Sequence, residues 1–73
     1  MKRIKQFERT DRDITNALLL LLEKNRFEKI TVAQIIEEAG INRSTFYQHF
    51  SDKYEIVERL QAKYLDEFVA VAQ

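Results

Sequence analysis

The stretch from residue 30 to residue 50 constrains the fold more than any other part of the chain. Thr31 and Gln34 stand three residues apart ahead of an apolar run, and this spacing predicts a capping box that opens a short helix. Gly40, the only glycine, is placed to stop that helix, and Asn42 is a suitable cap for the next one. Two short helices joined by so tight a turn predict a helix-turn-helix, in which the second helix projects from the body of the domain.

The rest of the sequence favours an all-α fold. Proline is absent and glycine occurs once in 73 residues, which argues against hairpins and long loops and for helices with short joints. A chain of this length forms one small domain with a marginal core. We therefore expect an all-α, three-helix head that contains the helix-turn-helix, followed by a long fourth helix.

Three segments are expected along the chain. Residues 1–9 are interpreted as a mobile basic arm, residues 10–57 as the helix-turn-helix domain, and residues 58–73 as the continuation of the fourth helix. The first helix is expected to begin at Thr10, whose hydroxyl can accept a hydrogen bond from a free backbone amide. It is expected to end near Asn25, because asparagine tolerates the left-handed conformation of a helix stop.

The spacing of apolar residues predicts which helix faces are buried. In the first helix the buried stripe consists of Ile14, Ala17, Leu18, Leu21 and Leu22, with Leu19 and Leu20 outside it. In the third helix Phe46 and Phe50 are four residues apart and share an inward face. The fourth helix is expected to begin at Ser51, with Asp52 in its first turn. Its stripe consists of Val57, Leu60, Tyr64, Phe68 and Val71, and Ile56, Leu65 and Val69 lie off that stripe.

Composition excludes several function classes. The chain has no cysteine and a single histidine, which leaves no disulfide framework and no thiolate or histidine-rich metal site. His49 has no nucleophile or carboxylate partner in the sequence pattern, so we expect no enzyme, no catalytic residue and no cofactor. The apolar run at residues 18–22 is too short to span a bilayer, which takes about 20 residues. We therefore expect no membrane partner, and a reducing cytoplasm as the location.

The distribution of charge is more informative than its sum. The formal net charge is zero, but residues 1–12 carry five basic and two acidic side chains, and residues 54–73 carry two basic and four acidic ones. A basic front and an acidic back permit binding to nucleic acid through one face, and a solvated surface of mixed charge is the alternative. A helical protein–protein interaction module is the rival function, since the long apolar fourth helix needs a partner.

The helix-turn-helix segment and its flanking residues resemble those of a known family. Residues 10–57 are similar to the N-terminal DNA-binding domain of TetR/AcrR-family transcriptional regulators. The matching residues, in register without gaps, are Thr31-Val32, Ile35, Ala39-Gly40-Ile41, Ser44-Thr45-Phe46-Tyr47, His49-Phe50 and Asp52-Lys53. Two positions depart from the pattern, because Arg26 and Ser44 stand where many members carry glycine. We expect Asn25 to take over the first of these turns.

The resemblance implies a set of DNA-contacting residues on and around the third helix. Arg43 and Ser44 fall where family members touch base edges, and Arg43 could bond guanine O6 and N7 together. The full candidate DNA-binding set is Thr31, Asn42, Arg43, Ser44, Thr45, Tyr47, Gln48, His49 and Lys53. For four of these an ordinary alternative stays open. Arg43 and Lys53 could be solvated side chains, Tyr47 a core aromatic, and His49 a packed, hydrogen-bonded core residue.

The resemblance also implies partners. Family members are homodimers that bind a palindromic operator in double-stranded DNA, and a larger C-terminal domain forms the dimer and binds a small-molecule inducer. We expect this chain to be an excised head, because the apolar stripe of the fourth helix is cut off rather than finished; a natural short protein is the alternative. By itself it should be a monomer or a weak dimer through residues 60–73. A small-molecule inducer is expected only if the C-terminal domain exists. We expect the regulator to be a repressor rather than an activator.

Overall fold

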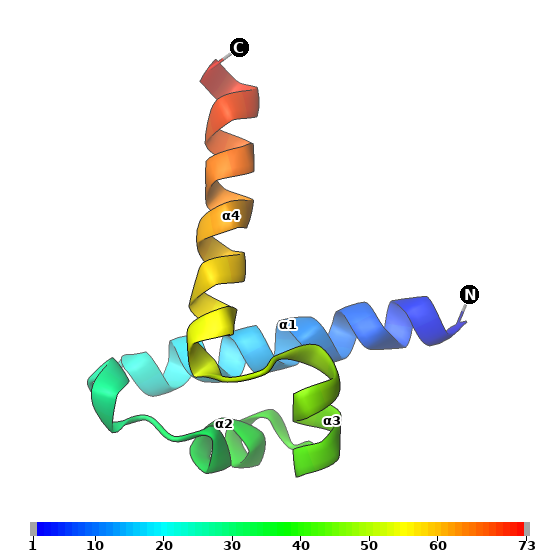
Figure 1. Ribbon diagram of the computed structural model, residues 1–73, viewed down its shortest axis with the longest axis vertical. Helices are drawn as coiled ribbons and strands as arrows, with labels where there is room; N and C mark the ends of the chain where they lie inside the picture. Colours follow the sequence, from blue (N-terminus) through cyan, green and yellow to red (C-terminus); the bar gives the residue numbers. More distant parts are fainter. Residues whose placement is uncertain (1, 73) are drawn as a thin grey trace.

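A computed structural model gives the fold; it describes the backbone of residues 2–72 and the side chains of residues 6–65. All elements in this part are helical: α1 (Lys2–Leu22), the 3₁₀ turn η1 (Phe27–Lys29), α2 (Val32–Ala39), α3 (Arg43–His49) and α4 (Lys53–Ala72). Figure 1 shows α1 lying across α2 and α3, with α4 rising steeply from the other helices. The predicted all-α head with a long fourth helix is confirmed.

The start of α2 follows the predicted capping box. The backbone amide of Gln34 donates to Thr31 Oγ1 at 3.1 Å, and the amide of Thr31 donates to Gln34 Oε1 at 2.8 Å. Ile30 and Ile35, which flank this box, are both fully buried in the same core cluster. The hydrophobic pair and the reciprocal bonds together define the angle at which the chain enters α2.

Gly40 ends α2 in the left-handed conformation, with φ of 71°. The amide of Ile41 donates to the carbonyl of Ile36 and the amide of Gly40 to that of Glu37, both at 3.2 Å, as in a Schellman motif. A Cβ on Gly40 would meet no atom within 4 Å. The backbone conformation, and not crowding by neighbours, is therefore what requires glycine here.

The expected start of the first helix at Thr10 is wrong, because α1 begins at Lys2. Thr10 lies within the helix, and its hydroxyl donates to the carbonyl of Gln6 one turn earlier, at 3.0 Å. A threonine hydroxyl can bond backwards inside a helix as well as cap one, so its presence did not mark a boundary. The backbone of residues 2–9 is helical, and the mobile arm expected there is not what the structure shows.

The end of α1 also differs in detail from the expectation. The helix stops at Leu22, and both the amide and the side-chain Nδ2 of Asn25 donate to the carbonyl of Leu21 at 3.0 Å. Among the described residues, no residue other than glycine has a positive φ, so Asn25 does not adopt the left-handed conformation. Asn25 closes the turn through its side chain instead. Leu22, expected in the buried stripe, is 38% exposed.

One cluster of buried side chains holds the helices together. Its members are Ile14, Ala17, Leu18, Ile30, Ile35, Phe46, Phe50 and Ile56, all 2% exposed or less. The inward face of α3 is thus confirmed. The predicted buried stripe of α4 is wrong at two positions. Ile56, which was expected off the stripe, is fully buried, and Tyr64, which was expected on it, is 62% exposed. The stripe was extrapolated along all of α4, but only its first turns meet the head.

The start of α4 lies two residues later than expected. The amide of Glu55 donates to Asp52 Oδ1 at 2.9 Å, and the amide of Ser51 donates to Glu55 Oε1 at 2.6 Å. Asp52 is therefore the N-cap residue of α4, and Ser51 lies one residue before it. The predictions for Phe68, Val69 and Val71 concern side chains outside the described residues.

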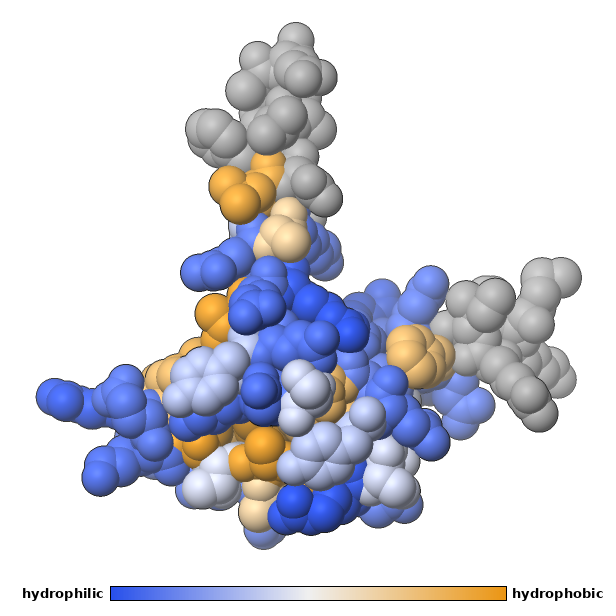
Figure 2. All heavy atoms as spheres, viewed as in Figure 1, coloured by the Kyte–Doolittle hydropathy of each residue, from blue (hydrophilic) through white to orange (hydrophobic). Residues whose placement is uncertain are grey.

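Apolar side chains remain exposed along α1 and α4. Leu19 and Leu20 are 43% and 53% exposed, and Tyr64 and Leu65 are 62% and 63% exposed. Figure 2 shows hydrophobic side chains on the part of α4 that rises above a largely hydrophilic head. In the described part of the chain, no helix combines the length and apolar character that crossing a membrane requires.

Candidate nucleic-acid interface

Helix α3 has one face that packs into the core and another that is exposed to solvent. Phe46 is fully buried and Phe50, at the end of the helix, is 2% exposed. The predicted contact residues Arg43, Tyr47 and Gln48 are all exposed. Because the inward face is apolar and packed, the outward side chains are carried on a helix that is anchored to the core.

Asn42 organises the first turn of α3. Its Oδ1 accepts hydrogen bonds from the Thr45 amide at 3.1 Å, from Thr45 Oγ1 at 2.7 Å and from Ser44 Oγ at 3.0 Å. Asn42 is thus confirmed as the cap of the helix, and its oxygen is saturated. Since both hydroxyl protons are directed at Asn42, the lone pairs of Ser44 and Thr45 remain as acceptors for an incoming donor.

Arg43 and Tyr47 lie one turn apart on the outward face. Arg43 Nη1 lies 3.4 Å from Tyr47 Oη, and its guanidinium carbon lies 6.0 Å from the centroid of the tyrosine ring. The long distance indicates a weak bond between two exposed groups. The guanidinium therefore stays close to the helix surface but keeps most of its donors free for a ligand.

Gln48 and Thr31 extend the polar surface to either side. Gln48 lines a shallow depression of about 230 Å³ between α1 and α3, together with Gln6, Phe7, Thr10, Thr45 and His49. Thr31 is exposed at the start of α2, where its side chain is part of the capping box. The free amide groups of a helix start and the polar lining of the depression both suit phosphate oxygens.

His49 is placed differently from the other predicted residues. Its side chain is 3% exposed, and its Nδ1 lies 2.8 Å from Asp11 Oδ1. The ring is stacked on Phe7, with centroids 3.9 Å apart and an interplanar angle of 19°. Because a carboxylate only accepts hydrogen bonds, Nδ1 must carry a proton. His49 is thus a packed, hydrogen-bonded residue of the core, which was the alternative to a DNA contact.

Lys53 is also engaged within the head. Its Nζ donates to the carbonyls of Phe27 and Ile30, at 2.6 and 2.7 Å, and lies 4.4 Å from the centroid of the Phe27 ring. These bonds tie the start of α4 to η1 and to the residue before the capping box. An ammonium has three donors, so one remains for another acceptor.

Three residues near α3 were missed by the sequence reasoning. The expected helix start at Thr10 put Asp11 in the first turn and left Phe7 in the arm, and Arg59 was only one of the charges counted over residues 54–73. In the structure Asp11 and Phe7 contact His49, and Arg59 Nη2 donates to the His49 carbonyl at 2.6 Å. The helical spacing of Phe7 and Asp11 was the available signal, since positions four apart share a face.

The described side chains offer no metal site that would compete with the outward face of α3. Within residues 6–65 no group of three or more histidine, cysteine or acidic side chains is arranged to hold a metal ion. Every buried side-chain nitrogen and oxygen in this part has a hydrogen-bond partner. The outward face of α3 is therefore the strongest candidate for a functional site.

Comparison with known proteins agrees with this geometry. Residues 14–60 match the family described as "Bacterial regulatory proteins, tetR family". An uncharacterised HTH-type transcriptional regulator, YxbF of Bacillus subtilis (strain 168), is 33% identical over 51 residues, which are 70% of this chain and 13% of that protein. The chain is therefore similar to a small part of a much longer protein.

A solved structure is similar over most of the chain. It is the TetR transcriptional regulator from Streptococcus agalactiae 2603V, with 36% sequence identity and a TM-score of 0.81. The match covers 88% of this chain and 36% of that one. The family match, the shared fold and the helix-turn-helix all agree. The chain therefore belongs to the TetR family of bacterial regulatory proteins and carries its helix-turn-helix DNA-binding domain.

Proposed function

We propose that this domain binds double-stranded DNA in a sequence-specific manner, with α3 in the major groove, as the head of a transcriptional repressor. The observation that carries the proposal is the division of α3 into a buried apolar face and an exposed face with Arg43, Tyr47 and Gln48. A helix of this kind fits the major groove, where each base pair presents a distinct set of donors and acceptors.

The chemistry of the outward side chains supports roles for each. Arg43 has the donor geometry to bond guanine O6 and N7, and Gln48 could bond adenine N6 and N7 if it reaches them. The hydroxyls of Ser44 and Thr45 donate their hydrogen bonds to Asn42 Oδ1. Their oxygen lone pairs are therefore suited to accept hydrogen bonds from the amino groups of adenine or cytosine.

Other members of the candidate set suit the DNA backbone. Tyr47 Oη, the helix start at Thr31 and the third proton of Lys53 are donors suited to phosphate oxygens. His49 is assigned to holding α3, because its side chain is almost completely buried. Asn42 contributes by shaping the first turn of the helix.

The proposal extends to the longer protein that such a domain serves. We propose a homodimer that binds a palindromic operator, with two heads about one helical turn apart on the DNA. Dimerisation and binding of a small-molecule inducer are assigned to residues beyond this chain, since the chain spans 36% of the solved relative. Such a regulator would work in the cytoplasm.

A protein-interaction module is the second candidate. The exposed side chains of Leu19, Tyr64 and Leu65 favour it, because they form apolar surface away from α3. The two functions use different faces of the molecule, so they are separable by experiment.

Selection from a pool of random DNA duplexes, followed by affinity measurements over a salt series, tests the proposal. We expect a selected duplex to bind more tightly than its scrambled control, and log affinity to fall with log salt by about 0.9 per phosphate contact. Equal affinity for the selected and scrambled duplexes would contradict sequence-specific reading. No binding to any duplex at low salt would favour the interaction module.

A further inference from the structure

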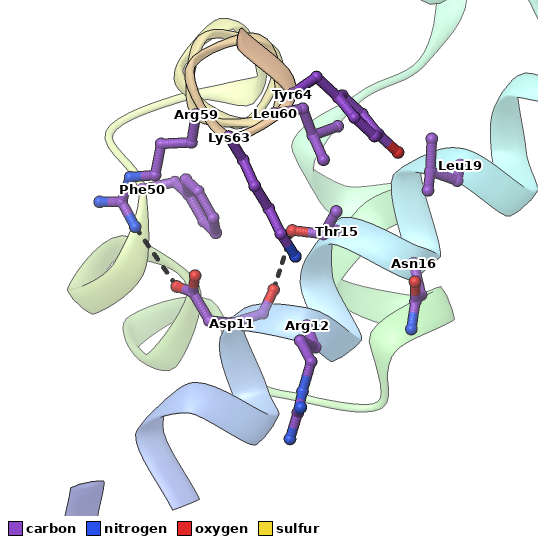
Figure 3. Close-up of a pocket in the computed structure, with 10 residues that line it drawn as sticks. All are labelled: Asp11, Arg12, Thr15, Asn16, Leu19, Phe50, Arg59, Leu60, Lys63 and Tyr64. Atoms are coloured by element: carbon purple, nitrogen blue, oxygen red, sulfur yellow. Dashed lines mark hydrogen bonds and ion pairs between the residues drawn. The ribbon is translucent and has the colours of Figure 1, made fainter. Parts of the chain in front are cut away.

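Three helices meet at one cluster of polar side chains behind the outward face of α3. We call Asp11 of α1, His49 of α3 and Arg59 of α4 the junction cluster. Asp11 Oδ1 lies 2.8 Å from His49 Nδ1 and 3.4 Å from Arg59 Nη1. Figure 3 shows Arg59 of α4 reaching toward Asp11 of α1 at the left side of the pocket that lies between these two helices.

Arg59 is bonded to the end of α3 through the backbone. Its Nη2 donates to the carbonyl of His49 at 2.6 Å, and this carbonyl belongs to the last turn of the helix. The guanidinium carbon also lies 4.4 Å from the centroid of the Phe50 ring. A cation at a helix C-terminus satisfies a free carbonyl and interacts favourably with the helix dipole.

Asp11 acts on the same end of α3 through the side chain of His49. The imidazole lies between the Asp11 carboxylate and the ring of Phe7, which is stacked on it with centroids 3.9 Å apart. Asp11 and Phe7 both precede residues 14–60, the range that matches the family. This part of the junction cluster is therefore supplied by residues outside the matched range.

The short length of α3 makes these contacts important. Seven residues give two turns, and the first turn is bonded mainly to its own cap, Asn42. The last turn is bonded to α1 and α4 through the junction cluster. A helix of this length has little rigidity of its own, so tertiary contacts at its end determine its direction.

We propose that Asp11 and Arg59 are positioning residues for DNA recognition. They hold the C-terminal end of α3 and so aim Arg43 and Tyr47, without contacting DNA themselves. The DNA part of this proposal rests on the proposed function. The part that concerns the orientation of α3 rests on the contacts of the junction cluster alone.

The first test needs no DNA. In Arg59→Met and Asp11→Ala, NMR-detected hydrogen exchange of the Phe50 amide, which donates to Phe46, should accelerate by roughly tenfold. The Gln34 amide at the start of α2 should exchange at its wild-type rate. Arg12→Met is the matched control for Arg59, because Arg12 is exposed on α1 and Figure 3 shows it pointing away from the cluster.

The second test measures binding to a duplex selected from a random pool by the wild-type chain. Arg59→Met should weaken affinity by about two- to thirtyfold, the range for residues that act through others. The slope of log affinity against log salt should stay unchanged, because no phosphate contact is lost. Asp11→Asn, which keeps an acceptor for His49, should recover much of the affinity lost in Asp11→Ala.

The outcomes separate the two claims. Wild-type chain that binds no duplex overturns the proposed function, and the exchange rates then still decide whether the junction cluster holds α3. A salt slope that falls by about one unit in Arg59→Met would make Arg59 a direct phosphate contact and overturn the positioning role. Unchanged exchange at Phe50 in both variants would also overturn it.

Discussion

The two ends of α3 are built in opposite ways. At the first turn, the side chain of Asn42 bonds only to Ser44 and Thr45, two and three residues later in the sequence, and Asn42, Arg43 and Ser44 are exposed. At the last turn, His49 is buried and its side chain bonds to Asp11, 38 residues away in sequence. Arg59, ten residues away, bonds to its carbonyl.

This difference suggests a division of labour within two helical turns. The first turn is capped locally, so its outward side chains can change without disturbing the rest of the head. The last turn is joined to α1 and α4, so changes there alter how the whole helix is held. Substitutions along α3 should therefore separate DNA affinity from stability.

The largest effect is expected from the buried aromatic residue between the two ends of α3. Phe46 is fully buried, and Phe46→Ala should lower the free energy of unfolding by about 3–5 kcal/mol, enough to unfold much of so small a domain. Urea denaturation followed by circular dichroism measures the change. Tyr47→Phe, next to it on the outward face, should change stability by less than about 0.5 kcal/mol. Equal losses in the two variants would mean that the burial of Phe46 is not what holds the helix.

The second prediction concerns base recognition by the first turn of α3. Arg43→Ala should cost roughly 1–3 kcal/mol of specific binding and relax the preference at one base pair in each half-site. Its unfolding curve should match the wild type, because Arg43 is exposed. The measurement compares selected and scrambled duplexes, with Lys24→Ala, exposed beyond the end of α1, as control. An equal loss on both duplexes would make Arg43 a phosphate contact.

The third prediction separates capping from reading at the same residue. Asn42→Ala removes the cap and should cost about 1 kcal/mol of stability. Asn42→Asp keeps a good cap, so its stability should stay close to the wild type, while the added carboxylate repels phosphates and weakens DNA binding. Thermal unfolding and duplex affinity are measured on both variants. Wild-type affinity in Asn42→Asp would place the first turn of α3 away from the DNA.

The smallest effect on the head is expected far from both ends. Leu65 is 63% exposed, and Leu65→Lys should change the unfolding free energy by less than about 0.5 kcal/mol. If α4 mediates weak self-association, sedimentation equilibrium at micromolar concentration should show a shift toward monomer in this variant. A tight dimer that persists in Leu65→Lys would point to another surface, such as Leu19 and Leu20.

The sequence predicted those elements whose signals are local. The capping box at Thr31, the helix stop at Gly40 and the Asn42 cap each depend on residues within a few positions, and all three are confirmed. The inward pair Phe46 and Phe50 was predicted for the same reason, because residues four apart share a helix face.

The features that the sequence did not reveal depend on distant contacts. Asp11 seemed to belong to a helix start, but its carboxylate bonds to His49 and Arg59. Lys53 seemed free for a phosphate, but two of its donors are used by backbone carbonyls of the segment before α2. No local pattern encodes which residue will lie opposite such a charge, so these contacts became visible only in three dimensions.

An NMR titration of the labelled chain with a selected duplex tests whether the outward face of α3 is the surface that contacts DNA. We expect the largest chemical-shift changes at residues 42–48 and at Thr31. Little change is expected along the groove between α1 and α4, which Leu19, Leu60 and Tyr64 help to line. Changes centred on that groove, with residues 42–48 unaffected, would contradict the claim that the first turn of α3 reads DNA while its last turn is held by the head.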